Sequence, residues 1–232
     1  MNILTTRPLI DAEDLMEKLF GMGHKIMHIP TLKISPAKFE PINSSKYEAY
    51  VFTSANAVRN IKFSKEDKNK LCFCVGSITE KKVRQIGYVK TISGGGNVNA
   101  LKNLILNSDE IDKDKIIAYF CGDNISSDLD DDLKKEGLRV EKITTYISEK
   151  IKELNDQSHK IINNYPPDII LVYSKRSAES FIELVKKYSL SGLMTGSRVM
   201  CISEKVLNVF RQAGWKKLET FEAGDELLKI GK

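Results

Sequence analysis

Residues 116–148 of this 232-residue chain read IIAYFCGDNISSDLDDDLKKEGLRVEKITTYIS, and residues 3–34 read ILTTRPLIDAEDLMEKLFGMGHKIMHIPTLKI. Both stretches open on a short apolar run, continue with spaced leucines typical of a helix, and reach a glycine before a second apolar run. Gly23 and Gly137 occupy equivalent places, where glycine commonly ends a helix. The pair therefore predicts strand–helix–strand units of the kind that build parallel sheets.

Three further pairs of segments repeat in the same order along the chain. In the last of these pairs, Asn99 and Asp225 each occupy the expected N-cap of a helix. Because four ordered pairs are hard to obtain by chance, we predict two homologous halves. The alternative is that all strand–helix units look alike. The pairs are YEAYVFTSANAVRNI (47–61) with PDIILVYSKRSAESFIEL (167–184), LCFCVGSITEKKVRQIGYVKTI (71–92) with RVMCISEKVLNVFRQAGWKKLETF (198–221), and GGGNVNALKNLIL (94–106) with AGDELLKI (223–230).

Two strand-like stretches, residues 32–36 and 146–149, could pair as crossovers between the halves. The chain would then begin in one domain, build the second, and return to the first. Periodicity alone does not decide between this arrangement and two consecutive domains.

Composition indicates a soluble protein with room for two domains. Hydrophobic residues make up 41% and charged residues 29%, and no apolar run reaches the length of a membrane span. We expect no secretory signal, because MNILTTRPLI reads as a first strand. The net charge of +5 is dispersed as lysine, which fits a small anionic substrate and disfavours nucleic acid. The four cysteines lack metal-ligand spacing, so we expect buried, reduced thiols of a cytosolic protein.

Candidate binding residues gather where predicted strands end and helices begin, which is where parallel sheets bind ligands. Helix N-termini there favour anions, although Ser, Thr, Asn and Asp are also ordinary N-caps. Nucleotide-phosphate fingerprints and a GxSxG nucleophile elbow are absent. Asp130–Asp132 are expected on an exposed helix face. The strand-end segments are Thr5–Arg7, Thr53–Asn56, Gly76–Thr79, Cys121–Asn124, Ser174–Ser177 and Ser203–Lys205.

The ordered set ILTTRP, YVFTSANAV, VGSIT, a helix–glycine–strand ending in Tyr146, and VYSKRSAESF resembles the uroporphyrinogen-III synthase family over nearly the whole chain. The resemblance implies two flavodoxin-like α/β domains joined by a two-stranded linker, residues 1–34 plus 149–232 and residues 35–148. It implies a cyclising lyase of heme biosynthesis that needs no metal and no organic cofactor. Its substrate would be hydroxymethylbilane, a linear tetrapyrrole with eight carboxylates, which loses water as ring D is inverted and the macrocycle closes.

The resemblance also assigns roles to residues. Tyr146 matches the family tyrosine thought to assist departure of the hydroxyl group; the alternative is a strand tyrosine packed at the linker. Two departures weaken the match: CISEK replaces a glycine-containing motif, and Cys121-Gly122 stands where Arg-Gly is frequent. The implied substrate-binding residues are Arg7, Thr53, Ser54, Gly76, Ser77, Thr79, Gly122, Asp123, Ser174, Lys175, Arg176 and Ser203.

We further expect a cytoplasmic monomer that contacts neither nucleic acid nor membrane and is functionally coupled to hydroxymethylbilane synthase. The competing hypothesis is a two-lobed anion-binding or regulatory protein that has the same fold without the activity.

Overall fold

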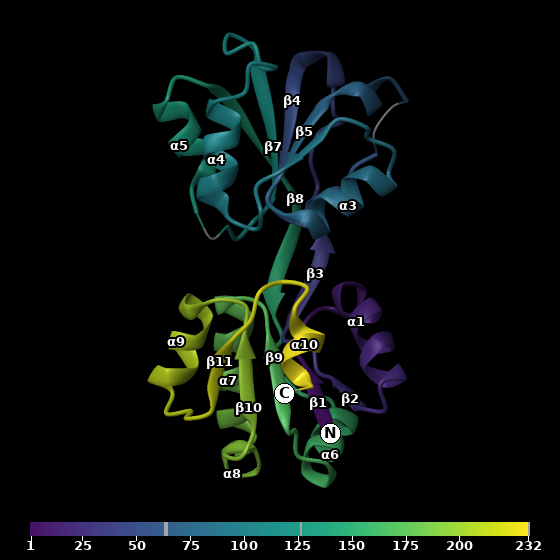
Figure 1. The fold of residues 1–232 in the computed structure, drawn as a ribbon, viewed down its shortest axis with the longest axis vertical. Coiled ribbons are helices and arrows are strands. Elements are labelled where there is room, and N and C mark those ends of the chain that lie inside the picture. The colour runs from purple at the N-terminus through teal and green to yellow at the C-terminus, as the bar shows by residue number, and fades with distance from the viewer. Residues whose placement is uncertain (63–64, 126, 232) are drawn as a thin grey trace. The chain divides into compact units, whose positions relative to one another are not determined.

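The computed structural model describes residues 1–62, 65–125 and 127–231. The chain divides into two compact units: unit 1 comprises Met1–Lys33 with Glu149–Lys232, and unit 2 comprises Ile34–Ser148. Each unit holds a mostly parallel sheet with helices on both faces (Figure 1). The predicted α/β class with parallel sheets is confirmed, whereas descent of the halves from a duplication stays a prediction.

Unit 1 contains a five-stranded sheet in the order β11-β10-β9-β1-β2. The pairings of β1 with β2 and β9, and of β10 with β9 and β11, are all parallel. Read from the β2 edge, the sheet has the order β2-β1-β9-β10-β11. Numbered 1 to 5 by their order in the chain, these strands lie in the order 2-1-3-4-5, which is the flavodoxin order. Its elements are β1 (Asn2–Thr5), α1 (Leu9–Gly21), β2 (Lys25–His28), α6 (Asp156–Asn164), β9 (Ile169–Val172), α7 (Lys175–Lys187), α8 (Ser191–Met194), β10 (Arg198–Cys201), α9 (Glu204–Gln212), β11 (Leu218–Thr220) and α10 (Glu226–Ile230).

Unit 2 contains a six-stranded sheet in the order β3-β8-β7-β4-β5-β6. Apart from β3, the five strands β8-β7-β4-β5-β6 correspond one to one with β2-β1-β9-β10-β11 of unit 1, which is the correspondence that the repeated segments predict. Its elements are β3 (Leu32–Pro36), the 3-10 turns Ser44–Lys46 and Lys65–Asn69, β4 (Tyr47–Phe52), α2 (Ala55–Arg59), β5 (Leu71–Cys74), α3 (Ser77–Gln85), β6 (Thr91–Ser93), α4 (Val98–Leu106), β7 (Ile116–Gly122), α5 (Leu129–Lys135) and β8 (Arg139–Lys150).

Alternation along the central strands divides each core into two layers. In β1, Leu4 faces the layer formed with α6, α7 and α9, while Ile3 faces α1 and α10. In β4 of unit 2, Val51 faces α4 and α5, while Phe52 faces α2 and α3. Strands covered on both faces are continuously apolar rather than alternating, as is typical of parallel sheets.

The four cysteines are buried and free, as predicted.

The helix-ending glycines behave as the sequence predicts. Gly23 and Gly137 have φ values of +83° and +88°, a conformation that residues with side chains rarely adopt.

Two details of the sequence interpretation were wrong. The N-cap of α4 is Asn97, whose side chain accepts from the backbone N–H groups of Asn99 and Ala100. Asp130 is buried, because it turns toward β8 and lies 3.6 Å from Lys142 as well as 3.2 Å from Lys134.

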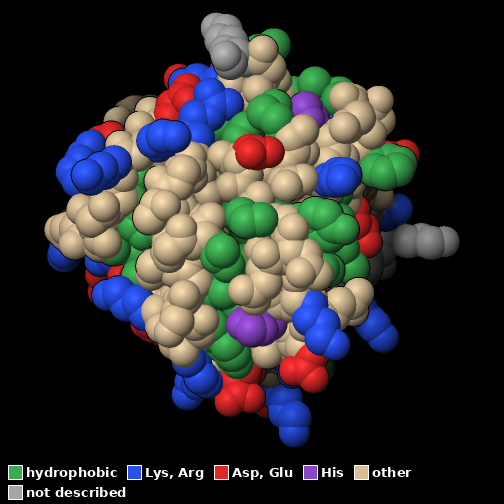
Figure 2. Space-filling view, turned by 90° about the horizontal axis from the view of Figure 1, so that it is seen from below, with side chains coloured by type: hydrophobic (Ala, Val, Ile, Leu, Met, Phe, Trp, Pro, Cys, Tyr) green, Lys and Arg blue, Asp and Glu red, His purple; other side chains and the backbone are tan. Residues whose placement is uncertain are grey.

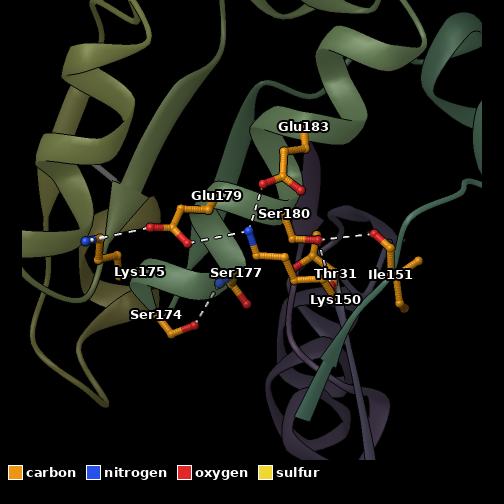
Figure 3. Close-up of polar contacts among 9 residues, drawn as sticks. All are labelled: Thr31, Lys150, Ile151, Ser174, Lys175, Ser177, Glu179, Ser180 and Glu183. Atoms are coloured by element: carbon orange, nitrogen blue, oxygen red, sulfur yellow. Dashed lines mark hydrogen bonds and ion pairs between the residues drawn. The ribbon is translucent and has the colours of Figure 1, made fainter. Parts of the chain in front are cut away.

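Both strands that run between the units are held by buried hydroxyl groups. In unit 1, Ser180 Oγ of α7 lies 2.9 Å from the Thr31 carbonyl oxygen and 3.2 Å from that of Ile151 (Figure 3). In unit 2, Thr145 Oγ1 of β8 lies 3.2 Å from the Ala57 carbonyl oxygen and 3.3 Å from that of Cys121. Unit 1 therefore fixes the chain next to both connecting strands, and unit 2 fixes β8.

The surface shows no single dominant feature on the face drawn in Figure 2. Lysine and arginine side chains are spread around its rim and are interleaved with acidic ones. In the described part of the chain, no helix combines the length and the apolar character that crossing a bilayer would take.

Candidate active site

The carboxyl ends of β4 and β7 form the switch point of the unit 2 sheet. These neighbouring strands connect outward in opposite directions, β4 to β5 and β7 to β8, and such points are the usual ligand sites of parallel sheets. Thr53, just past β4, places its Oγ1 3.1 Å from the Tyr119 hydroxyl of β7. Burial raises the pKa of Tyr119, so its phenol stays protonated and can share a hydrogen bond with Thr53.

Tyr146 lies at the same edge, on β8, with its ring directly against Gly122. A Cβ atom at position 122 would lie 2.5 Å from Tyr146 Cζ and 2.9 Å from its hydroxyl oxygen. Gly122 is paired with Tyr146 across β7 and β8 at a register shift. The tyrosine can occupy this place only because residue 122 has no side chain.

Asp123 serves the backbone of β8 rather than presenting a free carboxylate. Its Oδ1 accepts the Ser148 N–H at 2.9 Å, its Oδ2 accepts from Asn124 Nδ2 at 2.7 Å, and its own N–H donates to the Tyr146 carbonyl oxygen. These bonds hold the strand on both sides of Tyr146. Burial raises the pKa of the neighbouring Cys121 thiol to about 11, which disfavours a reactive thiolate at this edge.

The helix N-termini of unit 2 offer hydroxyl and backbone donors. Ser54 caps α2 by accepting the Asn56 N–H, so its side chain is partly committed to the helix. Gly76 begins α3 with extended backbone, and a Cβ there would lie 3.0 Å from Gly96 Cα of the triple-glycine loop. Ser77 is exposed, whereas Thr79 is buried under the first turn of α3. Of the predicted hydroxyl groups on α3, only that of Ser77 is accessible.

The equivalent switch point of unit 1 lies at the carboxyl ends of β1 and β9 and carries a cation. Arg7 Cζ lies 4.3 Å from the ring centroid of Tyr173, which directly follows β9. The backbone before Arg7 is anchored because the Thr6 hydroxyl donates to the Leu171 carbonyl oxygen. The His28 ring contacts the Arg7 carbonyl oxygen at 2.9 Å.

The first turn of α7 adds two further basic side chains. Ser174 caps this helix by accepting the Ser177 N–H at 3.0 Å. Lys175 is exposed and lies 3.7 Å from Glu179, as Figure 3 shows. Arg176 is half-buried, and its Nη1 has no hydrogen-bond partner among the described residues. On the next strand, Ser203 is exposed at the N-cap of α9 and makes no capping bond.

The structure thus places the predicted residues at two sheet edges, one in each unit. It also adds three residues that sequence reasoning missed: Tyr119, Tyr173 and Glu226. Tyr119 resembles an ordinary strand residue in the sequence, whereas the position of Tyr173 directly after a strand was an available signal. Glu226 is buried near Tyr173 and gave no signal in the sequence. Among the described residues, no group of three or more acidic, histidine or cysteine side chains is placed to hold a metal ion.

A family model described as uroporphyrinogen-III synthase HemD matches residues 13–223. The chain belongs to the uroporphyrinogen-III synthase family. Its function is therefore the cyclisation of hydroxymethylbilane to uroporphyrinogen III in heme biosynthesis, a lyase reaction on a small-molecule substrate. The resemblance read from the sequence motifs is confirmed.

Solved structures of the family share the fold at low sequence identity. The uroporphyrinogen-III synthetase from Helicobacter pylori is 16% identical, with a TM-score of 0.65 over 99% of this chain and 97% of that one. A mutant uroporphyrinogen III synthase from the extremely thermophilic bacterium Thermus thermophilus is 12% identical, with a TM-score of 0.58 over 97% of this chain and 93% of that one. No curated protein matches the sequence.

Proposed function

We propose that Tyr146 is the catalytic residue of this synthase and assists departure of the substrate's hydroxyl group. The supporting observation is the contact between its ring and Gly122, which sets the phenol at the carboxyl ends of β4 and β7. A phenol there can donate a hydrogen bond to the leaving oxygen as it gains negative charge. The C–O bond breaks and the oxygen leaves as hydroxide, the terminal rings join through a new C–C bond with ring D inverted, and the proton released from ring D completes the loss of water.

In this proposal, donors at the strand ends bind the substrate carboxylates. In unit 2 these are Thr53, Ser54, Ser77 and the backbone at Gly76 and Gly122. In unit 1 they are Arg7, Ser174, Lys175, Arg176 and Ser203. The partial positive charge at each helix N-terminus stabilises a bound carboxylate by about 0.3–1 kcal/mol. Thr79, being buried, and Asp123, being bound to β8, support this edge rather than contact the substrate.

The division of roles follows from what each group can supply. Guanidinium and ammonium groups neutralise carboxylates, which holds the flexible linear substrate in a folded shape. Hydroxyl groups and a protonated phenol supply directed hydrogen bonds at the reacting carbon without adding charge. The free substrate closes on its own to the type I isomer, so holding the chain in the shape that inverts ring D is the larger part of catalysis.

A coupled assay tests the proposal. Hydroxymethylbilane is generated in situ by its synthase, and the type I and type III products are separated after oxidation to porphyrins. We expect Tyr146→Phe to lower kcat for type III by about 10²-fold with an unchanged thermal unfolding curve, because only the hydroxyl is removed. Type III formation near the wild-type rate would remove Tyr146 from the mechanism. Exclusively type I product from the wild-type chain would instead favour an inactive binding or regulatory protein.

The proposal includes a cytoplasmic monomer that receives its substrate from hydroxymethylbilane synthase. The support is chemical: the substrate cyclises spontaneously to the wrong isomer, so a short transfer time matters. Sedimentation velocity of the chain alone and mixed with that synthase is the measurement. A stable dimer of the chain would contradict the proposed monomer. A type III yield that stays constant when both enzymes are diluted would indicate that the substrate diffuses freely between them.

A further inference from the structure

Tyr173 occupies the switch point of the unit 1 sheet, and its ring contacts two side chains. Arg7 lies over one face of its ring, with Cζ 4.3 Å from the centroid. Phe221, which is buried, meets the ring at 5.2 Å in an edge-to-face arrangement of 75°. The ring is therefore packed against an apolar side chain and also carries a cation over its face.

The hydroxyl of Tyr173 is enclosed and makes no hydrogen bond of good geometry with a described residue, although Glu226 and Arg7 lie close enough to act on it. Burial raises the pKa of Tyr173, Glu226 raises it further, and Arg7 acts in the opposite direction. The phenol is thus neutral, and what it offers to Arg7 is the negative face of its ring.

Arg7 is held without being neutralised. The side chain makes no ion pair with any described carboxylate, and its Cζ lies over the ring of Tyr173. The buried carboxylate of Glu226 binds the backbone of its own segment, because its Oε2 accepts the Gly224 N–H at 2.9 Å. Arg7 therefore keeps the paired donors that bind a carboxylate in a bidentate manner.

We propose that Tyr173 is a positioning residue that holds the Arg7 guanidinium ready for one carboxylate of the substrate, an inference that rests on the proposed binding role of Arg7. The residue acts through Arg7 and not on the reacting atoms. Its contribution is to reduce the freedom that a long side chain would otherwise lose on binding. The ring face alone supplies this effect.

A double-mutant experiment tests the proposal. Tyr173→Phe and Tyr173→Leu are made in the wild-type and the Arg7→Ala backgrounds, and KM and kcat for type III formation are measured in the coupled assay. We expect Tyr173→Phe to leave KM unchanged and Tyr173→Leu to raise it about fivefold at constant kcat. In the Arg7→Ala background, Tyr173→Leu should cause no further rise. Tyr165→Leu is the control, because Tyr165 carries Lys25 at 5.2 Å on an exposed surface of the same unit.

Three results would overturn the proposal: an unchanged KM for Tyr173→Leu, an equal rise in both backgrounds, or an equal rise for Tyr173→Phe. If Tyr173→Leu does not fold, Tyr173→Met fills the same space without a ring face and takes its place. Failure here is distinguishable from failure of the catalytic role. An Arg7→Ala variant with wild-type KM ends this proposal and leaves Tyr146 untouched, whereas an active Tyr146→Phe variant leaves the KM comparison intact.

Discussion

At the carboxyl ends of β4 and β7, unit 2 places Thr53, Tyr119 and Tyr146. At the corresponding ends of β9 and β1, unit 1 places Tyr173 and Arg7 beside the basic first turn of α7. The two sheets share a strand order, so the difference lies in side chains and not in architecture. Unit 2 presents neutral hydroxyl groups, and unit 1 presents cations. The proposed roles accordingly assign the reaction chemistry to unit 2 and the binding by cations to unit 1.

Close backbone approach is a second difference between the edges. In unit 2, Gly122 admits the Tyr146 ring and Gly76 admits Gly96. In unit 1, the residue at the N-cap of α9 that corresponds to Gly76 is Ser203, which is exposed. Glycine is therefore required where the unit 2 edge is crowded. The CISEK departure in unit 1 reflects an edge with room for a side chain.

The largest expected effect comes from disturbing the contact between Gly122 and Tyr146 in unit 2. Gly122→Ala places a methyl group 2.5 Å from Tyr146 Cζ, so the ring must move away from its position. We expect kcat for type III to fall by about 10²-fold or more, because misplacement by about 1 Å costs that much. Gly192→Ala is the control, since a Cβ at Gly192 meets no atom within 4 Å. Wild-type kcat in Gly122→Ala would mean that the placement of the ring is irrelevant.

The next effect concerns the unit 1 edge and should appear in KM instead of kcat. Arg176→Ala removes a half-buried cation at the start of α7. We expect KM to rise about tenfold with kcat retained, and the salt dependence of KM to become shallower. Lys216→Ala, an exposed lysine preceding β11, should leave both parameters unchanged. A loss of kcat at constant KM would contradict the division of roles between the units.

A smaller effect concerns the attachment of the connecting strands in unit 1. Ser180→Ala leaves the Thr31 and Ile151 carbonyl groups without the buried hydroxyl. We expect the free energy of unfolding to fall by about 1–3 kcal/mol. Urea denaturation measures this, with Ser191→Ala on α8 as an exposed control. If Ser180→Ala and Ser191→Ala unfold alike, the hydroxyl does not stabilise the attachment.

The smallest effect is a pH dependence confined to unit 2. Hydrogen bonds from Thr91 and Arg84 hold the pKa of the Glu80 carboxyl below its ordinary value. Because the folded pKa is lowered, the stabilisation is present above the unfolded pKa and is lost as pH falls through the folded one. We expect Glu80→Gln to cost about 0.5–1 kcal/mol at neutral pH and less at acid pH, as the carboxylate of the wild type becomes protonated.

The matched control is Glu13→Gln on the exposed surface of α1 in unit 1. Urea denaturation at the two pH values should show no difference between this variant and the wild type. A Glu80→Gln effect that persists unchanged at acid pH would assign the stabilisation to shape and not to charge.

Several features were predictable from the sequence because they depend on local chemistry. The apolar runs predict strands covered on both faces, Gly23 and Gly137 predict helix ends, and residues 32–36 predict a crossover strand. The strand-end hydroxyl residues predict N-caps, and Ser54 and Ser174 are N-caps. In each case the governing interactions lie within a few residues along the chain.

Contacts between distant segments required the tertiary structure. The Arg7–Tyr173 and Thr53–Tyr119 pairs join residues on strands that become neighbours only when the sheet order is known. The fit of Tyr146 over Gly122 depends on a register shift between β7 and β8 that has no sequence signature. The sequence by itself therefore determined the elements, the repeated pattern and the family. The assignment of cations to one edge and a phenol to the other was decided by folding, because side chains acquire their neighbours only when the strands align.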